Sequence, residues 1–161
     1  MKLLAVIVLV GAGYFAGGLA AEKRTRAFLQ ALGILRLLYA VRAGIQSTRT
    51  GLFDVFCAFS DPALEECGFL RVLRGGAPPV RLCWETACRA LSPDIPMHGV
   101  ISGLGNELGM SDAVTQLGML ARVCGELELR TGEMRRELRV KTGNYRLLGA
   151  LAGCMAAIVL Y

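Results

Sequence analysis

The sequence contains little histidine and lacks the cysteine spacing of a zinc site. His98 is the only histidine among 161 residues, and no two of the six cysteines form a CxxC pair. Structural zinc sites usually take their ligands from such closely spaced pairs. Cys83 and Cys88 are five residues apart in a predicted helix, so we expect them to point to different faces. We therefore expect His98 to be structural or solvated, and we predict no metal and no cofactor.

Motifs for nucleotide binding or catalysis are also missing. Gly103-Leu104-Gly105 has the start of a phosphate-binding loop, but no predicted strand precedes it and it does not extend to GxGxxG. We interpret Glu65 and Glu66 as a solvated helix face, and Trp84, the only tryptophan, as a core residue. The sequence therefore offers no candidate catalytic residue.

Charge is absent from both ends of the sequence. Residues 3–21 and 147–161 hold no charged side chain, and the mean hydropathy of +0.49 is high for a soluble domain. A helix rises 1.5 Å per residue, so crossing a core of about 30 Å takes ~20 residues. The second stretch reaches only ~22 Å, although Arg146 can extend its charge toward the headgroups. We predict transmembrane helices over residues 1–21 and 146–161, with a helical domain over 22–145.

A cleaved signal peptide is the alternative interpretation of the first apolar stretch. Lys2 supplies a minimal basic start, and the small residues GGLAA resemble a cleavage site. The basic segment EKRTR follows directly and opposes export of what comes after it. An exported, membrane-tethered thiol or metal-binding domain is the corresponding alternative function. Sequencing of the mature N-terminus distinguishes the two.

Basic residues cluster against the apolar stretches, whereas a nucleic-acid-binding protein would not need this placement. Lys and Arg are enriched where a span meets the cytoplasm, so both clusters predict a cytoplasmic central domain with both termini across the membrane. Contacts with lipid headgroups are expected for the same residues. The clusters consist of Lys23, Arg24, Arg26, Arg135, Arg136, Arg139, Lys141 and Arg146.

The first half of the central part reads as a series of helices. Residues 22–46 carry an apolar stripe at Phe28, Leu32, Leu35 and Tyr39, widened by Leu29, Leu38, Val41 and Ile45. The stripe predicts an amphipathic helix, and the first span can run directly into it. Thr50 is a candidate cap for a short helix over 51–60. Asp61 is a candidate N-cap, and Pro62 suits the first position of a helix. Together they predict a third helix that runs through Leu73.

The second half continues the helical pattern. RGGAPP is the clearest loop, followed by a predicted helix over residues 80–91. Ser92-Pro93-Asp94 predicts the start of a fifth helix that ends near Leu108. The last one begins at Ser111 as its cap and runs toward Lys141, with Val114, Leu117, Ala121, Cys124, Leu127, Thr131, Met134 and Leu138 as its apolar stripe. With no alternating β pattern, the fold class is all-α, a helical bundle between two membrane anchors.

One segment resembles a known family. The stretch LGNELGMSDAVTQ, which opens a long charged helix before a terminal apolar run, is similar to the stage III sporulation protein AB family of endospore-forming bacteria. The basic helix after an apolar start also fits, but Gly51-Leu52 stands where the family tends to have Pro-Leu. The motif residues are Leu108, Gly109, Ser111, Asp112 and Gln116.

The resemblance implies a fold and a cellular role. It implies a cytoplasmic helical domain similar to the F-type platform domain of type II secretion systems. It also implies a non-enzymatic membrane subunit on the mother-cell side, in the outer forespore membrane, of the channel complex that links the two cells. The expected partners are membrane lipid and the stage III sporulation proteins AA (an ATPase), AC, AD, AE, AF, AG and AH, with no nucleic acid and no small-molecule substrate.

Overall fold

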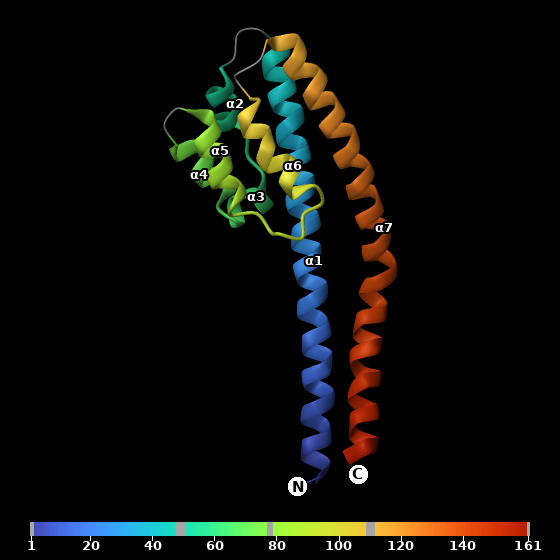
Figure 1. The fold of residues 1–161 in the computed structure, drawn as a ribbon. Coiled ribbons are helices and arrows are strands. Elements are labelled where there is room, and N and C mark those ends of the chain that lie inside the picture. Colours follow the sequence, from blue (N-terminus) through green and yellow to red (C-terminus); the bar gives the residue numbers. More distant parts are fainter. Residues whose placement is uncertain (1, 48–50, 77–78, 109–111, 161) are drawn as a thin grey trace. The chain divides into compact units, whose positions relative to one another are not determined.

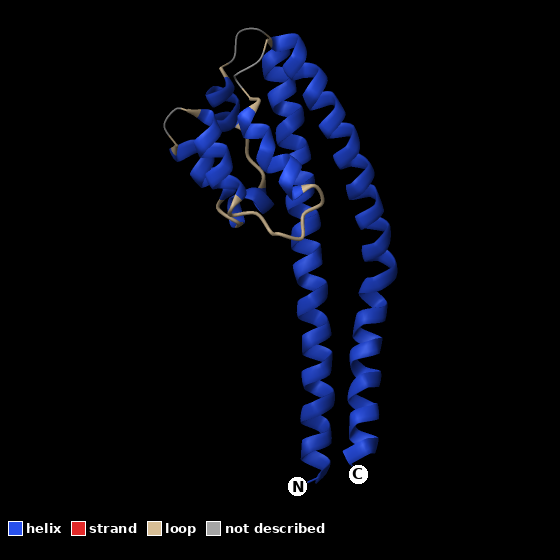
Figure 2. Ribbon diagram, viewed as in Figure 1, coloured by secondary structure: helices blue, strands red, loops and turns tan. Residues whose placement is uncertain are grey.

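The computed structural model is helical throughout the part of the chain that it describes (Figure 2). The backbone is described for residues 2–47, 51–76, 79–108 and 112–160. Side chains are described at residues 18–19, 21–47, 51–76, 79–108, 112–139, 151 and 155. The predicted all-α class is confirmed for these residues.

Two long helices and a set of short ones make up the fold (Figure 1). The predicted continuation of the first apolar stretch into the amphipathic helix is confirmed, because α1 is a single helix. The last helix, α7, is likewise continuous and extends past Lys141 through the second apolar stretch. The elements are α1 (Lys2–Gln46), α2 (Leu52–Ala58), α3 (Pro62–Glu66), α4 (Phe69–Gly75), α5 (Val80–Cys88), α6 (His98–Gly103), the 3-10 helix η1 (Leu104–Asn106) and α7 (Ala113–Leu160).

The chain divides into two compact units. The first combines Met1–Thr25 with Glu133–Tyr161, which are the outer parts of α1 and α7. The second is Arg26–Gly132 and holds the short helices together with the inner parts of the two long ones. The first unit contains both predicted spans, and the second contains most of the predicted cytoplasmic domain.

Trp84 is at the centre of the core of the second unit, as predicted. Its side chain is fully buried, and its Nε1–H donates to the carbonyl of Ile101 at 2.7 Å. Phe69 meets the indole edge-on, with ring centroids 5.6 Å apart. A Cβ on Gly105 would lie 2.9 Å from the indole Cδ1, so the glycine permits close packing. The GLG sequence is therefore part of the core of this unit.

The short helices begin and end at residues with identifiable signals. The predicted cap at Asp61 is confirmed, since its Oδ1 accepts from the backbone N–H of Ala63 at 3.1 Å. The predicted run through Leu73 is wrong, because Gly68 adopts φ +85° and separates α3 from α4. Gly51 occupies the N-cap position of α2, and Thr50 lies outside the described residues.

The fifth predicted helix begins later than expected. Ser92 Oγ accepts from the backbone N–H of Asp94 at 3.3 Å, which makes a local turn. Pro96 lacks an N–H and disfavours helical geometry in the residue before it, so the helix cannot continue through this segment. The helix α6 consequently starts at His98.

The buried faces of both long helices agree only in part with the predicted stripes. On α1 the predicted Leu35, Leu38 and Val41 are buried, whereas the predicted Tyr39 is 39% exposed. Ala27, Ala31 and Ile34 are also fully buried and were not predicted. The buried face of α7 consists of Gln116, Leu120, Val123, Cys124, Leu127 and Thr131, while the predicted Val114 is 79% exposed. Of the stripe predicted for α7, Cys124, Leu127 and Thr131 are thus buried.

One helical segment among the described residues, Ala21–Gln46, is long and apolar enough to cross a membrane, with a hydropathy of 1.4. A buried core helix or a signal sequence has the same properties. Ala27, Ile34 and Leu38 in this segment are fully buried, which accounts for its apolar composition as core. Most side chains of the predicted span at residues 3–21 lie outside the described residues.

Candidate interaction surfaces

The family motif lies at the start of α7. Leu108 is buried just before it, and Gln116 is buried in its first turns. Asp112 directly precedes the helix, and its Oδ2 accepts from the backbone N–H of Thr115 at 3.2 Å. The described cap is therefore Asp112, whereas Gly109 and Ser111 lie outside the described residues.

The electrostatic state of Asp112 follows from its cap geometry. Thr115 Oγ1 donates to Oδ1 at 2.6 Å, and this bond is the main cause that lowers the pKa of Asp112 from its ordinary value of 3.8. The backbone N–H of Thr115 lowers the pKa further. These hydrogen bonds stabilise the start of the helix. The Asp112 side chain is exposed, so its carboxylate also remains open to solvent.

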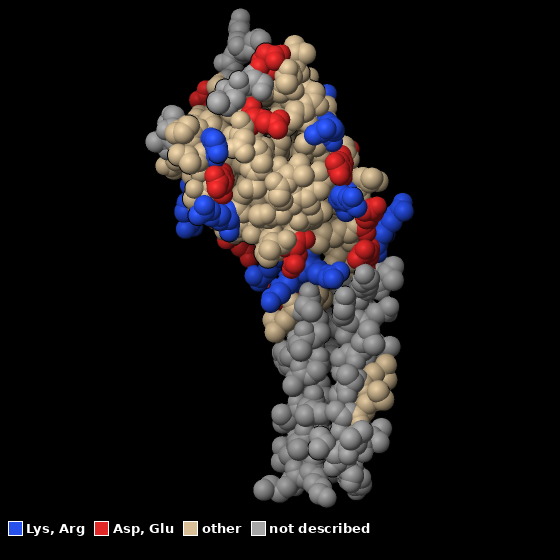
Figure 3. All heavy atoms as spheres, in the orientation of Figure 1, with Lys and Arg blue, Asp and Glu red and all other residues tan. Residues whose placement is uncertain are grey.

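An ion pair joins the two long helices within the first unit. Arg24 Nη1 lies 3.6 Å from Glu137 Oε2, and about half of each side chain is exposed. The described basic side chains of this unit are all exposed, and they are Lys23, Arg24, Arg135, Arg136 and Arg139. Figure 3 shows Lys and Arg side chains interspersed with Asp and Glu on one face. Lys141 and Arg146 lie on α7, but their side chains are outside the described residues.

Sequence reasoning missed an ion pair in the second unit that joins an exposed arginine to a buried carboxylate. Asp61 was predicted only as a helix cap, but the residue is also buried, with only 3% of its surface exposed. Its Oδ2 accepts from Arg36 Nη1 at 3.0 Å while the same carboxylate caps α3. A buried carboxylate requires such partners. The Asp-Pro signal located the cap, but no local pattern identifies Arg36, which is 25 residues away.

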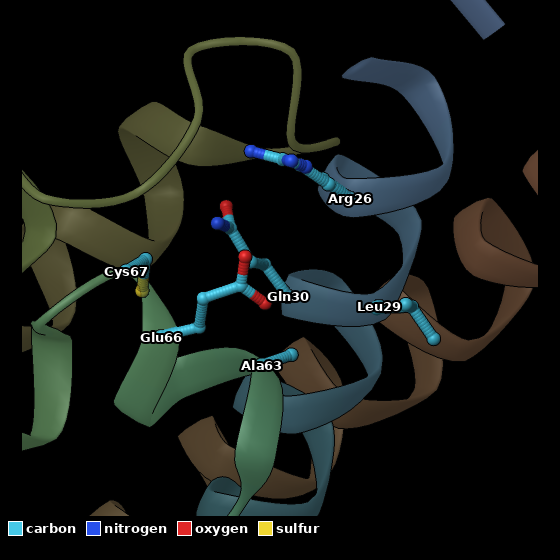
Figure 4. A pocket seen from close by; sticks show the side chains of 6 residues that line it. All are labelled: Arg26, Leu29, Gln30, Ala63, Glu66 and Cys67. Atoms are coloured by element: carbon cyan, nitrogen blue, oxygen red, sulfur yellow. The ribbon is translucent and has the colours of Figure 1, made fainter. Parts of the chain in front are cut away.

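A pocket lies between α1 and α3 in the second unit (Figure 4). Its volume is about 140 Å³, well above the ~10–15 Å³ that one water molecule needs. Arg26 and Glu66 lie on opposite sides of Gln30 in this view. The lining residues are Arg26, Leu29, Gln30, Ala63, Glu66 and Cys67. Arg26, assigned from sequence to the basic clusters, thus lies in a pocket that no sequence pattern predicted.

Three of the described thiols have a raised pKa, which is typical of buried core groups and not of nucleophiles. Burial raises the pKa of Cys88 to about 12, and it also raises the pKa of Cys67 and of Cys124. A thiol with a raised pKa holds little thiolate at neutral pH. The interpretation of the cysteines as core residues is confirmed for Cys83, Cys88 and Cys124, whereas Cys67 is half-buried and Cys57 is exposed.

His98 does not contribute to a described metal site. Its Nε2 lies 3.3 Å from the backbone carbonyl of Cys88, which places the ring against the end of α5. Among the residues that the structure describes, no group of three or more His, Cys, Asp or Glu side chains is placed to hold a metal ion.

The described architecture is that of an all-helical protein with an apolar N-terminal helix and a set of short helices. No curated protein sequence and no solved structure matches the chain. Residues 2–161 match the family model for stage III sporulation protein AB. The chain therefore belongs to the stage III sporulation protein AB family, which assigns it a role in stage III of sporulation.

Proposed function

We propose that this protein is a non-enzymatic platform subunit of the membrane complex that links mother cell and forespore. The observation that carries the proposal is the family match over residues 2–161. The continuity of α1 supports it, because one helix joins the uncharged residues 3–21 to the packed second unit. In this arrangement the second unit is cytoplasmic, both termini lie across the membrane, and the other stage III sporulation proteins are the partners.

The proposed architecture gives each unit a separate task. The first unit anchors the chain, with exposed basic side chains at the level where Arg24 meets Glu137. The second unit presents short helices and the motif at the start of α7 to soluble or membrane partners. A platform of this kind has an F-type helical domain, and it transmits contacts without a reaction of its own.

Topology is the direct test of this proposal. A reporter active only outside the cytoplasm, inserted at Gly75-Gly76 at the end of α4, should be silent because the flanking basic clusters retain this segment inside. A second reporter of cytoplasmic activity at the same position should be active. External activity at this position would contradict the orientation and the platform function.

Processing of the N-terminus tests the exported alternative. Sequencing the protein recovered from sporulating cells should give Met1 or Lys2. A mature start near Ala21 would instead favour an exported, membrane-tethered domain. Recovery of other stage III sporulation proteins in a pull-down from the same cells tests the partners.

A further inference from the structure

We propose that the pocket between α1 and α3 binds the headgroup of phosphatidylethanolamine, with the phosphate toward Arg26 and the ammonium group toward Glu66. The inference rests on the proposed function, because it requires α1 to enter the membrane next to the pocket. It goes beyond the headgroup contacts expected for Arg26 from the sequence, because it assigns a pocket, a second charged residue, Glu66, and one class of lipid.

The pocket presents opposite charges on two walls. Arg26 belongs to α1 and Glu66 to α3, and Figure 4 shows them on either side of the Gln30 amide. A guanidinium group matches the geometry of phosphate oxygens, whereas a carboxylate accepts charge-assisted hydrogen bonds from an ammonium group. A headgroup that carries both charges complements the two walls, whereas a purely anionic headgroup is repelled by Glu66.

Two polar groups of the pocket, Glu66 and Gln30, have capacity for a ligand. Glu66 is exposed and makes no hydrogen bond or ion pair with the described residues. The Gln30 side chain is fixed by its Oε1, which accepts from the backbone N–H of Ser92 at 2.9 Å. Its Nε2 has no partner among the described side chains and backbone groups, so it can donate to a phosphate oxygen.

The position of the pocket along α1 matches the headgroup layer. The predicted span ends at Ala21, and Arg26 follows five residues later in the same helix. Five residues rise about 7.5 Å. The polar layer on each side of the hydrocarbon core is ~5–8 Å thick. Arg26 therefore leaves the helix near the outer edge of this layer, from where its long side chain can extend toward the lipid phosphates. Leu29, which is 47% exposed, lines the same pocket.

Phosphatidylethanolamine is favoured over phosphatidylcholine by hydrogen bonding. A primary ammonium group donates three hydrogen bonds, as a lysine does, whereas the trimethylammonium of choline donates none. The two headgroups share the phosphate, so Arg26 does not distinguish them. Glu66 is therefore the residue that determines the selectivity.

The test is native mass spectrometry of the full chain. The protein is mixed in detergent with equal amounts of phosphatidylethanolamine, phosphatidylcholine and phosphatidylglycerol, and it is then released from the detergent in the spectrometer. The wild type should retain phosphatidylethanolamine roughly three- to fivefold over phosphatidylcholine, the ratio expected for one exposed charged contact. Glu66→Gln should bring this ratio to about one, because it keeps the shape and removes the charge. Arg26→Gln should lower the retention of both lipids, because they share the phosphate.

Glu107→Gln is the matched control, because Glu107 is exposed, lies outside the pocket, and its substitution removes the same charge. It should keep the wild-type ratio. A wild-type ratio near one, a ratio unchanged in Glu66→Gln, or stronger retention of phosphatidylglycerol would overturn the pocket assignment. Carbonate extraction separates this outcome from failure of the proposed function. A chain that carbonate removes from the membrane contradicts the proposed platform function. A chain that stays in the membrane but shows no lipid preference contradicts only the assignment of the pocket.

Discussion

Gly33 determines how closely α1 approaches the beginning of α3. A Cβ at this position would lie 2.8 Å from Asp61 Oδ1 and 2.8 Å from Leu64 Cγ. Asp61 cannot move aside without weakening both its cap and its ion pair with Arg36. We expect Gly33→Ala to lower the free energy of unfolding by ~1–3 kcal/mol, as overpacking does, although alanine favours the helix.

Denaturation of the purified full chain in detergent, followed by circular dichroism, measures this effect. Gly125→Ala is the control, because nothing lies within 4 Å of a Cβ built there on α7. This control should keep or raise stability by up to ~1 kcal/mol. Equal stability changes in the two variants would contradict the close approach at Gly33.

Asp112 gives the helix start a dependence on pH. The bonds from Thr115 lower the pKa of Asp112 below 3.8, so the cap stabilises the folded state at neutral pH and is lost as pH falls through the folded-state pKa. We expect Asp112→Ala to lower the thermal midpoint at neutral pH. The difference from wild type should shrink as pH falls below about 4.

Asp112→Asn separates the acceptor from the charge. Asparagine keeps a side-chain oxygen that accepts from the N–H of Thr115, and it does not titrate. This variant should be more stable than Asp112→Ala at neutral pH and should keep the same difference from it down to acidic pH. A midpoint insensitive to both substitutions would show that the cap makes no measurable contribution.

At the scale of elements, α7 joins the two units as one helix. The boundary between them falls between Gly132 and Glu133. Inserting two glycines there costs roughly 1 kcal/mol each in helix propensity and rotates everything beyond by about 200°. We expect the insertion to abolish sporulation while the amount of protein in the membrane stays unchanged, measured as spore titre and by immunoblot.

Alanine insertions at the same position separate rotation from flexibility. Two alanines give the same rotation with a smaller propensity cost, and four return the helix to within about 40° of its original phase. Function should be lost with two alanines and partly regained with four. Wild-type sporulation in all three strains would leave the protein as a passive tether.

The elements also show how far the sequence could be interpreted. Asp61-Pro62 and the RGGAPP loop carry local signals that act within a few residues. The cap was placed correctly, and RGGAPP spans the break between α4 and α5, although α4 extends to Gly75 and residues 77–78 lie outside the described residues. The break at Gly68 was missed because a glycine within an apolar pattern does not reveal a positive φ. The face that α7 buries depends on which side the other helices cover, so Val114 was misplaced although the spacing was read correctly. The pocket joins α1 to α3, and such a pairing is absent from any local pattern.

The whole molecule contains two segments that could serve as the first membrane span. Residues 3–21 are uncharged and form the predicted span. Ala21–Gln46 is also long and apolar enough to cross a membrane, but it contributes buried residues to the second unit. We expect deletion of residues 3–21 to weaken retention in carbonate-washed membranes, because the remaining C-terminal stretch reaches only ~22 Å. Immunoblotting of pellet and supernatant measures the retained fraction.

Deletion of residues 147–161 is the paired experiment. The N-terminal stretch of 19 uncharged residues is long enough to hold the chain by itself, so this deletion should leave most of the protein in the pellet. Removal of both stretches should release it. Full retention after the double deletion would identify Ala21–Gln46 as the membrane segment and would contradict its assignment to the core.

The burial of Trp84 makes the protein its own fluorescent reporter. It is the only tryptophan, and it is enclosed by Phe69, Phe56 and the carbonyl of Ile101 within one unit. Its emission therefore monitors the interior of residues 26–132 and is insensitive to events confined to the predicted spans. Quenching by a small soluble agent should be weak in the native chain and should rise only when the short helices separate. A binding partner that leaves the emission unchanged would thus act without loosening this interior.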